Sequence, residues 1–219
     1  MKYDFTIFGS GISAKIISSL LARNGFKVCL ISDRDQNQKI NTNLVTFLSA
    51  GSLNYLLSVF SDMQFLNKYP EIKSINCHLN SLGTDKVQSI NFNEPNNTVL
   101  GRIVRNSDLE DYLDEQINNI NNLNIINERQ LSAINNTNAG VKLKLDNGKD
   151  IESELFILSS SKKSIVSQIN IDFLERDLEQ EALSINIKGD IKNKNHAFQK
   201  FTKDGPLALL PYSKNEASI

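Results

Sequence analysis

The chain has 219 residues, 40% of them hydrophobic, which is enough for one large domain or two small ones with a substantial core. Its formal net charge is -1 and its charges are interspersed, so nothing predicts a nucleic-acid partner. Cys29 and Cys77 lack the spacing of a disulfide or metal site, and we interpret them as buried apolar residues in a reducing compartment. Neither a signal-peptide core nor a transmembrane run is present, which predicts a cytoplasmic protein and leaves peripheral contact with the inner membrane open.

The first 33 residues predict a strand, a glycine turn, a helix and a second strand. An apolar run at residues 5–8 meets Gly9-Ser10-Gly11-Ile12-Ser13-Ala14, and a second apolar run follows at 28–31. One glycine relieves the backbone strain of the turn, and the other lets a diphosphate approach the amides of the helix N-terminus. Ala14 takes the third position of the GxGxxG/A pattern, which packs the helix on the strand. An ordinary turn that happens to use two glycines is the alternative.

A dinucleotide site of this kind also needs an acid about twenty residues after the turn, to hold the adenosine ribose. Ser32 directly follows the second apolar run, and Asp33 comes one residue later. The residues expected to bind the cofactor are Gly9, Ser10, Gly11, Ile12, Ser13, Ala14, Asp33 and Arg34.

The middle of the chain alternates between helical and strand patterns. Ser49 is a predicted helix cap, and a second helix begins at Asn106 or Ser107 with three acidic residues near its start, which we interpret as matching the helix dipole. Period-two alternation predicts a hairpin over 75–79 and 87–92. Further strands are expected at 123–126, 130–134, 140–145, 150–158, 182–187, 197–202 and 207–210.

The apolar run 155–158 is typical of a buried parallel strand that returns to the opening sheet, and the polar turn 159–164 follows at its carboxyl end, where ligands bind in open α/β sheets. We therefore predict an α/β fold in which a Rossmann-like FAD-binding domain, 1–70 and 98–178, is interleaved with a mostly antiparallel β-sheet substrate domain, 71–97 and 179–219. The last three residues resemble the start of an unpartnered strand, which suggests a truncated chain.

Four segments resemble the FAD-dependent hydroxylases of ubiquinone biosynthesis, which are relatives of p-hydroxybenzoate hydroxylase. They are residues 3–11, 48–53, 101–106 and 197–211, and the most specific match is Phe201 to Pro211, where the family typically carries "RFT..GPLA.LP". The resemblance runs along the whole chain but covers about the first half of a family member's usual length.

This resemblance implies a monooxygenase whose FAD, reduced by NAD(P)H or another reductant, uses dioxygen to hydroxylate an aromatic ring. The implied partners are a polyprenylated aromatic substrate and other ubiquinone-biosynthesis proteins. No catalytic residue is assigned, because the reactive atom belongs to the flavin.

The chain departs from the family where the cofactor should be held. Ser32 stands at the position of the ribose-binding acid, Leu44 at that of an arginine, and Ser160 and Ser161 at those of the aspartate and glycine of a "GADG" segment. Two further hypotheses therefore stay open. One is a non-catalytic homologue that keeps the fold as a lipid-binding or assembly subunit, and the other is a flavin or NAD oxidoreductase with a different substrate.

Overall fold

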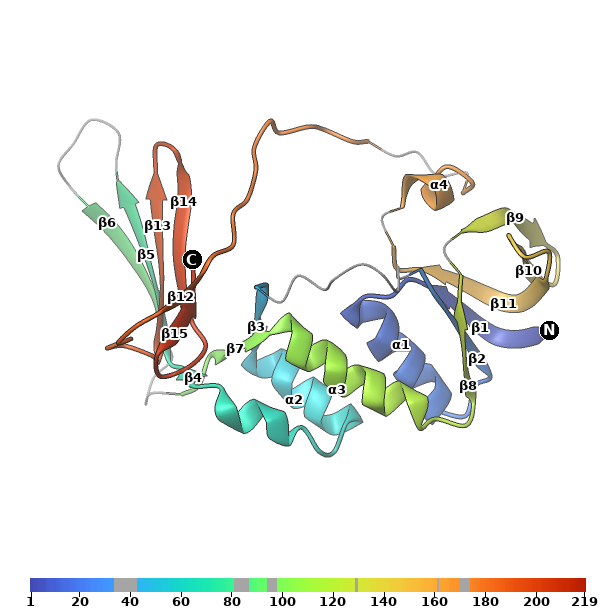
Figure 1. Cartoon of the computed structure of the whole chain (residues 1–219), viewed down its shortest axis with the longest axis horizontal. Helices are drawn as coiled ribbons and strands as arrows, with labels where there is room; N and C mark the ends of the chain where they lie inside the picture. Colours follow the sequence, from blue (N-terminus) through green and yellow to red (C-terminus); the bar gives the residue numbers. More distant parts are fainter. Residues whose placement is uncertain (34–42, 81–86, 94–97, 129, 161, 170–173) are drawn as a thin grey trace. The chain divides into compact units, whose positions relative to one another are not determined.

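The structure is a computed structural model that describes residues 1–33, 43–80, 87–93, 98–128, 130–160, 162–169 and 174–219 (Figure 1). The chain forms two compact units, each built from two separate stretches of sequence. The first unit comprises Met1–Ile40 and Glu110–Leu178, and the second comprises Asn41–Leu109 and Glu179–Ile219.

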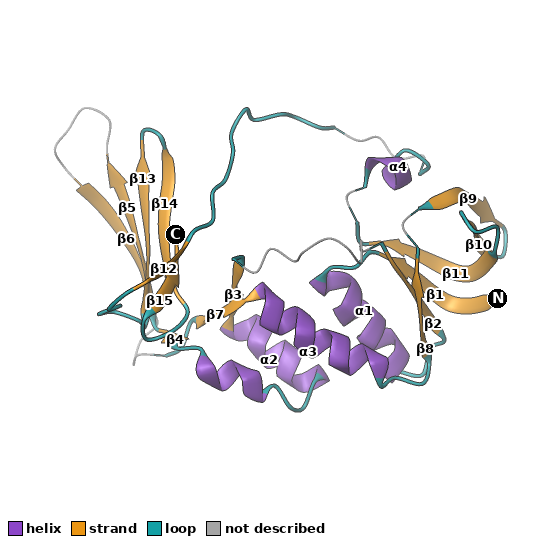
Figure 2. Cartoon of the chain, in the orientation of Figure 1, coloured by secondary structure: helices purple, strands orange, loops and turns teal. Residues whose placement is uncertain are grey.

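The first unit contains a six-stranded sheet in the order β8-β2-β1-β11-β10-β9. Its parallel strands are β1 (Lys2–Phe8), β2 (Val28–Ser32), β8 (Leu123–Asn127) and β11 (Asp150–Leu158). Helix α1 (Ile12–Arg23) connects β1 to β2, as the glycine turn predicts (Figure 2). Strands β9 (Leu131–Thr137) and β10 (Gly140–Leu145) add an antiparallel edge. The Rossmann-like α/β fold class and the return of residues 155–158 beside β1 are confirmed.

Both faces of this sheet carry an apolar core, because buried parallel strands direct alternate side chains to opposite faces. On one face, Ile7, Val28 and Leu30 pack with Ala14 and Ala22 of α1. On the other face, a second buried cluster draws on β1, β2, β9, β10, β11 and α4 (Lys163–Val166); its members are Tyr3, Phe8, Cys29, Ile31, Leu131, Leu143, Leu145, Ile151 and Ile165.

The second unit contains a six-stranded sheet in the order β12-β15-β14-β13-β5-β6. All neighbouring strands are antiparallel except β5 and β13, which confirms the mostly antiparallel second sheet. The strands are β5 (Ser74–Asn80), β6 (Val87–Asn93), β12 (Asn186–Lys188), β13 (His196–Thr202), β14 (Gly205–Pro211) and β15 (Glu216–Ser218).

A smaller, three-stranded sheet completes the second unit. Strand β7 (Gly101–Arg105) lies between β3 (Val45–Ser49) and β4 (Glu71–Ile72). Helix α2 (Ala50–Val59) and the 3-10 helix η1 (Gln64–Lys68) connect β3 to β4, and Ser49 caps α2 as predicted by accepting a hydrogen bond from the Ser52 amide.

The units divide the chain at other places than the predicted domain boundaries. Residues 41–70 and 98–109 group with the second unit, whereas the prediction put them with the cofactor domain. The physical reason is the pairing of β3 and β4 with β7, which joins these stretches to the segment that continues into β5. Helix α3 (Asn106–Asn118) begins in the second unit and continues into the first.

Two expectations about the C-terminal region are wrong. The predicted strand at 182–187 begins at Asn186, where pairing with β15 starts. The final strand is not unpartnered, because β15 pairs with both β12 and β14.

In the described parts of the chain, no helix combines the length and apolarity needed to cross a lipid bilayer.

Candidate functional site

The predicted cofactor residues gather at one end of the first sheet, where the chain changes direction. From β1 the chain passes through α1 to β2 on one side, while the other neighbour of β1 is β11, which comes more than a hundred residues later. Such a switch point is where open α/β sheets bind ligands. Gly9 and Ser159 directly follow β1 and β11 there.

Gly9 is required by the backbone at this point. Its φ is +146°, and an added Cβ would lie 2.3 Å from the main-chain oxygen of Ser159. Its amide donates to the carbonyl of Ile31 at 2.9 Å, and the amide of Ser159 donates to the carbonyl of Phe8 at 2.8 Å. Gly9 therefore lets the ends of β1, β2 and β11 lie close together.

Gly11 leaves the N-terminus of α1 open. It is the N-cap residue, with φ of -78°, and no side chain of the described residues caps the first turn. Within the described part of the chain, an added Cβ at Gly11 would have no atom within 4 Å, and both Gly11 and Ser13 are exposed. The free amides of a helix start and the helix dipole favour an anion at such a place.

Ala14 performs the packing role predicted for the third position of the motif. It is fully buried against Ile7 and Leu30. Its carbonyl also accepts a hydrogen bond from the Ser18 hydroxyl at 2.7 Å.

Asp33 directly follows β2, because the strand extends through Ser32. The Ser160 hydroxyl donates to Asp33 Oδ2 at 2.8 Å, and Lys162 Nζ lies 3.5 Å from the same oxygen. Burial raises the pKa of the Asp33 carboxyl, but hydrogen bonds from Ser10 and Ser160 and the nearby Lys162 ammonium lower it more, so the net shift is downward. The carboxylate is therefore ionised and hydrogen-bonded within the protein.

Ser10 and Asp33, two of the residues expected to bind the cofactor, thus lie near each other in the structure. Ser160 and Lys162, which were not expected at the site, lie beside them. The signal for these two was the polar turn after the predicted strand at 155–158. Arg34 and Ser161 lie outside the described residues.

Two parts of this site differ in how well they suit a dinucleotide. The open turn at Gly11 fits a diphosphate, since it offers uncapped amides and unfilled space. The ribose position fits less well, because hydroxyls of the protein already bind the Asp33 carboxylate.

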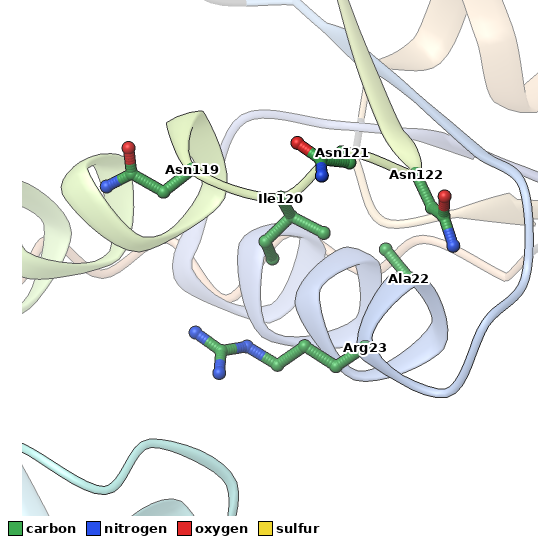
Figure 3. A pocket seen from close by; sticks show the side chains of 6 residues that line it. All are labelled: Ala22, Arg23, Asn119, Ile120, Asn121 and Asn122. Atoms are coloured by element: carbon green, nitrogen blue, oxygen red, sulfur yellow. The ribbon is translucent and has the colours of Figure 1, made fainter.

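A shallow pocket of about 350 Å³ lies at the opposite end of α1 from the glycine turn (Figure 3). Its lining comes from the end of α1 and the residues that follow α3, namely Ala22, Arg23, Asn119, Ile120, Asn121 and Asn122. The 12 residues of α1 span about 18 Å, so this pocket is separate from the glycine turn.

The second unit carries an apolar sheet face. The register places Leu79 opposite Phe201 and Ile75 opposite Phe92, and directly paired residues share a face. Ile90, which lies opposite Cys77, is on this face too. The exposed fractions are 36% for Leu79, 51% for Ile90, 53% for Phe92 and 40% for Phe201.

No family model matches the chain. Among curated proteins it is similar to "Ubiquinone biosynthesis monooxygenase COQ6, mitochondrial" of Dictyostelium discoideum, with 21% identity in an alignment of 255 positions that covers 99% of this chain and 52% of that protein. The chain therefore spans about half the length of this curated relative.

The chain is also similar in fold to solved structures. The chain superposes on pqsL, a probable FAD-dependent monooxygenase from Pseudomonas aeruginosa, with a TM-score of 0.79 and 12% identity over 100% of this chain and 59% of that one. It also matches the Y270F mutant of MHPCO with a TM-score of 0.67 and 15% identity, over 100% of this chain and 58% of that one. The chain has the fold of these proteins, and the predicted resemblance to FAD-dependent hydroxylases is confirmed.

Proposed function

We propose that this chain forms the dinucleotide-binding part, and a portion of the substrate-binding part, of an FAD-dependent monooxygenase. The observation that carries the proposal is the open glycine turn at the switch point between β1 and β11, in a fold shared along the whole chain with pqsL. In this proposal the amides that follow Gly11 bind the diphosphate, and Gly9 holds the turn against Ser159.

Bound FAD, reduced by NAD(P)H or another reductant, would supply oxygen-transfer chemistry to an organic substrate. The chain's own residues do the binding and orienting. Ala14 fixes α1 on the sheet, so that the first-turn amides keep their direction. The buried Phe8 and Ile31 hold the two strand ends beneath the turn.

For the substrate, we propose an aromatic, polyprenylated precursor of ubiquinone. The name of the Dictyostelium relative supports this pathway, and the exposed apolar face around Ile90, Phe92 and Phe201 suits a hydrocarbon ligand. A lipid of this kind would bring the protein to the surface of a membrane and to other enzymes of the same pathway, which we propose as its partners.

A second candidate function is a non-catalytic homologue that keeps the fold as a lipid-binding or assembly subunit. The hydrogen bonds of Asp33 within the protein favour this alternative, because they weaken the predicted grip on the cofactor's ribose.

Flavin uptake separates the two candidates. The protein, purified at its full natural length, is expected to be yellow or to take up one equivalent of added FAD, with quenching of the flavin fluorescence. The Gly11→Ala variant should bind more weakly, because a methyl group would stand where the diphosphate approaches. A colourless protein that takes up no FAD would exclude the enzyme and favour the binding subunit.

A further inference from the structure

Three side chains of the first unit meet at the Asp33 carboxylate, whose side chain is 9% exposed. The Ser160 hydroxyl donates to Oδ2 at 2.8 Å, and the nearby Ser10 side chain helps to lower the pKa of the carboxyl. The Lys162 ammonium lies 3.5 Å from Oδ2 and donates to the main-chain carbonyl of Asp33 at 3.0 Å.

These contacts tie together two segments that are distant in sequence. Asp33 directly follows β2, and Ser160 and Lys162 follow β11. The amide of Lys162 also donates to the Ser160 hydroxyl at 3.4 Å, which orients that hydroxyl toward the carboxylate. These contacts therefore hold the carboxyl ends of β2 and β11 together.

The cluster also uses part of the acceptor capacity that a ribose would need. A carboxylate has about four acceptor positions. In dinucleotide sites an acid at this place accepts hydrogen bonds from the ribose hydroxyls. Here the Ser160 hydroxyl and the Lys162 ammonium already engage Oδ2, so a ribose hydroxyl that approached this oxygen would compete with an existing bond of the same chemical kind. Such an exchange adds little to affinity.

We propose that Asp33 is a positioning residue, a clamp between the ends of β2 and β11, and that Ser160 takes the place of a ribose hydroxyl. The proposal rests on the proposed function in that it concerns the adenosine side of the same site. It follows that FAD is held mainly by its diphosphate at the amides after Gly11.

Thermal unfolding without added flavin tests the clamp. Asp33→Asn is expected to lower the melting temperature of the flavin-free protein by roughly 3–8 °C, because charge-assisted hydrogen bonds are lost. Glu154→Gln, an exposed acid of β11 in the same unit, is the matched control and should leave the melting temperature unchanged. A melting temperature of Asp33→Asn equal to that of the control would overturn the clamp.

Flavin affinity tests the occupied ribose position. Ser160→Ala frees one acceptor position of Asp33, and it should therefore tighten FAD binding by about two- to tenfold, measured by fluorescence quenching. FMN, which lacks the adenosine and one of the two phosphates of FAD, should bind Ser160→Ala and the unaltered protein equally, even if it binds both more weakly than FAD does. A merely structural role of Ser160 would not tighten binding, and unchanged or weaker FAD binding by this variant would overturn the proposal.

Failure of the proposed function gives a different pattern. If the unaltered protein binds neither FAD nor FMN, the monooxygenase proposal fails, while the melting temperature of Asp33→Asn still decides whether Asp33 is a clamp. If FAD binds and Asp33→Asn weakens it more than tenfold without a change in melting temperature, the monooxygenase proposal survives and the clamp is overturned.

Discussion

The main-chain oxygen of Ser159 lies 2.3 Å from the position that a Cβ on Gly9 would occupy. The contact partner is backbone within a paired sheet, so it cannot move aside as a flexible side chain could. The φ of +146° at Gly9 adds a second penalty for any other residue. Gly9→Ala should therefore lower the free energy of unfolding by about 1–3 kcal/mol or more, measured by urea denaturation.

Gly11→Ala is the matched control for this substitution. Its φ of -78° suits alanine, and the space around it is open. The loss in free energy of unfolding should stay below about 1 kcal/mol, the cost of a poorer N-cap. Equal losses for the two variants would contradict the distinct roles assigned to the two glycines.

Local patterns were enough to predict the first unit's architecture. The glycine spacing and the apolar runs predicted β1, α1, β2 and β11, because turn geometry and side-chain period act over a few residues. The pairing of β3 with β7 was not predicted, because both strands are short and the paired residues lie about sixty positions apart in the chain. The division of the chain into two compact units depends on that pairing.

At the candidate site, too, contacts between residues that are distant in sequence could not be predicted. The sequence predicted Gly9, Gly11 and Asp33 from their spacing, but Ser160 is 127 residues from Asp33 and Lys162 is 129. Both were visible only as part of a polar turn after a strand. Which residue of such a turn reaches a given carboxylate depends on how β1, β2 and β11 lie side by side, and one sequence does not contain that information.

Neutralising Lys15 and neutralising Asp114 should lower the free energy of unfolding by unequal amounts. Lys15 Nζ lies 2.7 Å from Asp114 Oδ1 and 3.8 Å from Glu110 Oε2, and the lysine side chain is 5% exposed, against 38% for that of Asp114. Removing the carboxylate leaves a buried ammonium group with a weaker partner, whereas removing the ammonium leaves a carboxylate that water can reach. Asp114→Asn should cost about 2–3 kcal/mol in the free energy of unfolding, and Lys15→Met about 1 kcal/mol or less. Denaturant titration of both variants measures the difference, and a larger loss for Lys15→Met would contradict it.

Tyr69 and Asp108 link stability to acid pH in the second unit. The Tyr69 hydroxyl donates to Asp108 Oδ2, and the Lys68 ammonium pairs with the same oxygen. Burial raises the pKa of the Asp108 carboxyl, but the contacts with Lys68 and Tyr69 lower it more, so its pKa lies below the ordinary value of 3.8. Because the folded-state pKa is depressed, this stabilisation is present above pH 3.8 and is lost as the pH falls through the folded-state pKa.

Tyr69→Phe tests this link. The variant should lose about 1–2 kcal/mol in the free energy of unfolding at pH 7, because a hydrogen bond to a charged group is removed. The difference from the unaltered protein should shrink as the pH falls below 3.8 and through the folded-state pKa of Asp108. Tyr55→Phe, at an exposed tyrosine of α2, is the control. A difference that stays the same from pH 7 down to the acid unfolding of the protein would show that the contact does not depend on the Asp108 charge.

Cys29 should be inert while the protein is folded. It is fully buried in β2, and burial raises the pKa of its thiol from 9.0 to about 12. Since the thiolate is the reactive form, an aromatic disulfide reagent at pH 8 should modify the half-buried Cys77 alone in the native protein and both cysteines after denaturation.

The raised pKa of Cys29 also means that the folded state keeps a proton that the unfolded state releases, so the free energy of unfolding should fall as the pH rises from about 9 to 12. Cys29→Ala should reduce this dependence on alkaline pH, although the cavity that it leaves lowers stability at every pH. Two modified thiols in the native protein, or an unchanged alkaline slope in Cys29→Ala, would show that this strand opens to solvent.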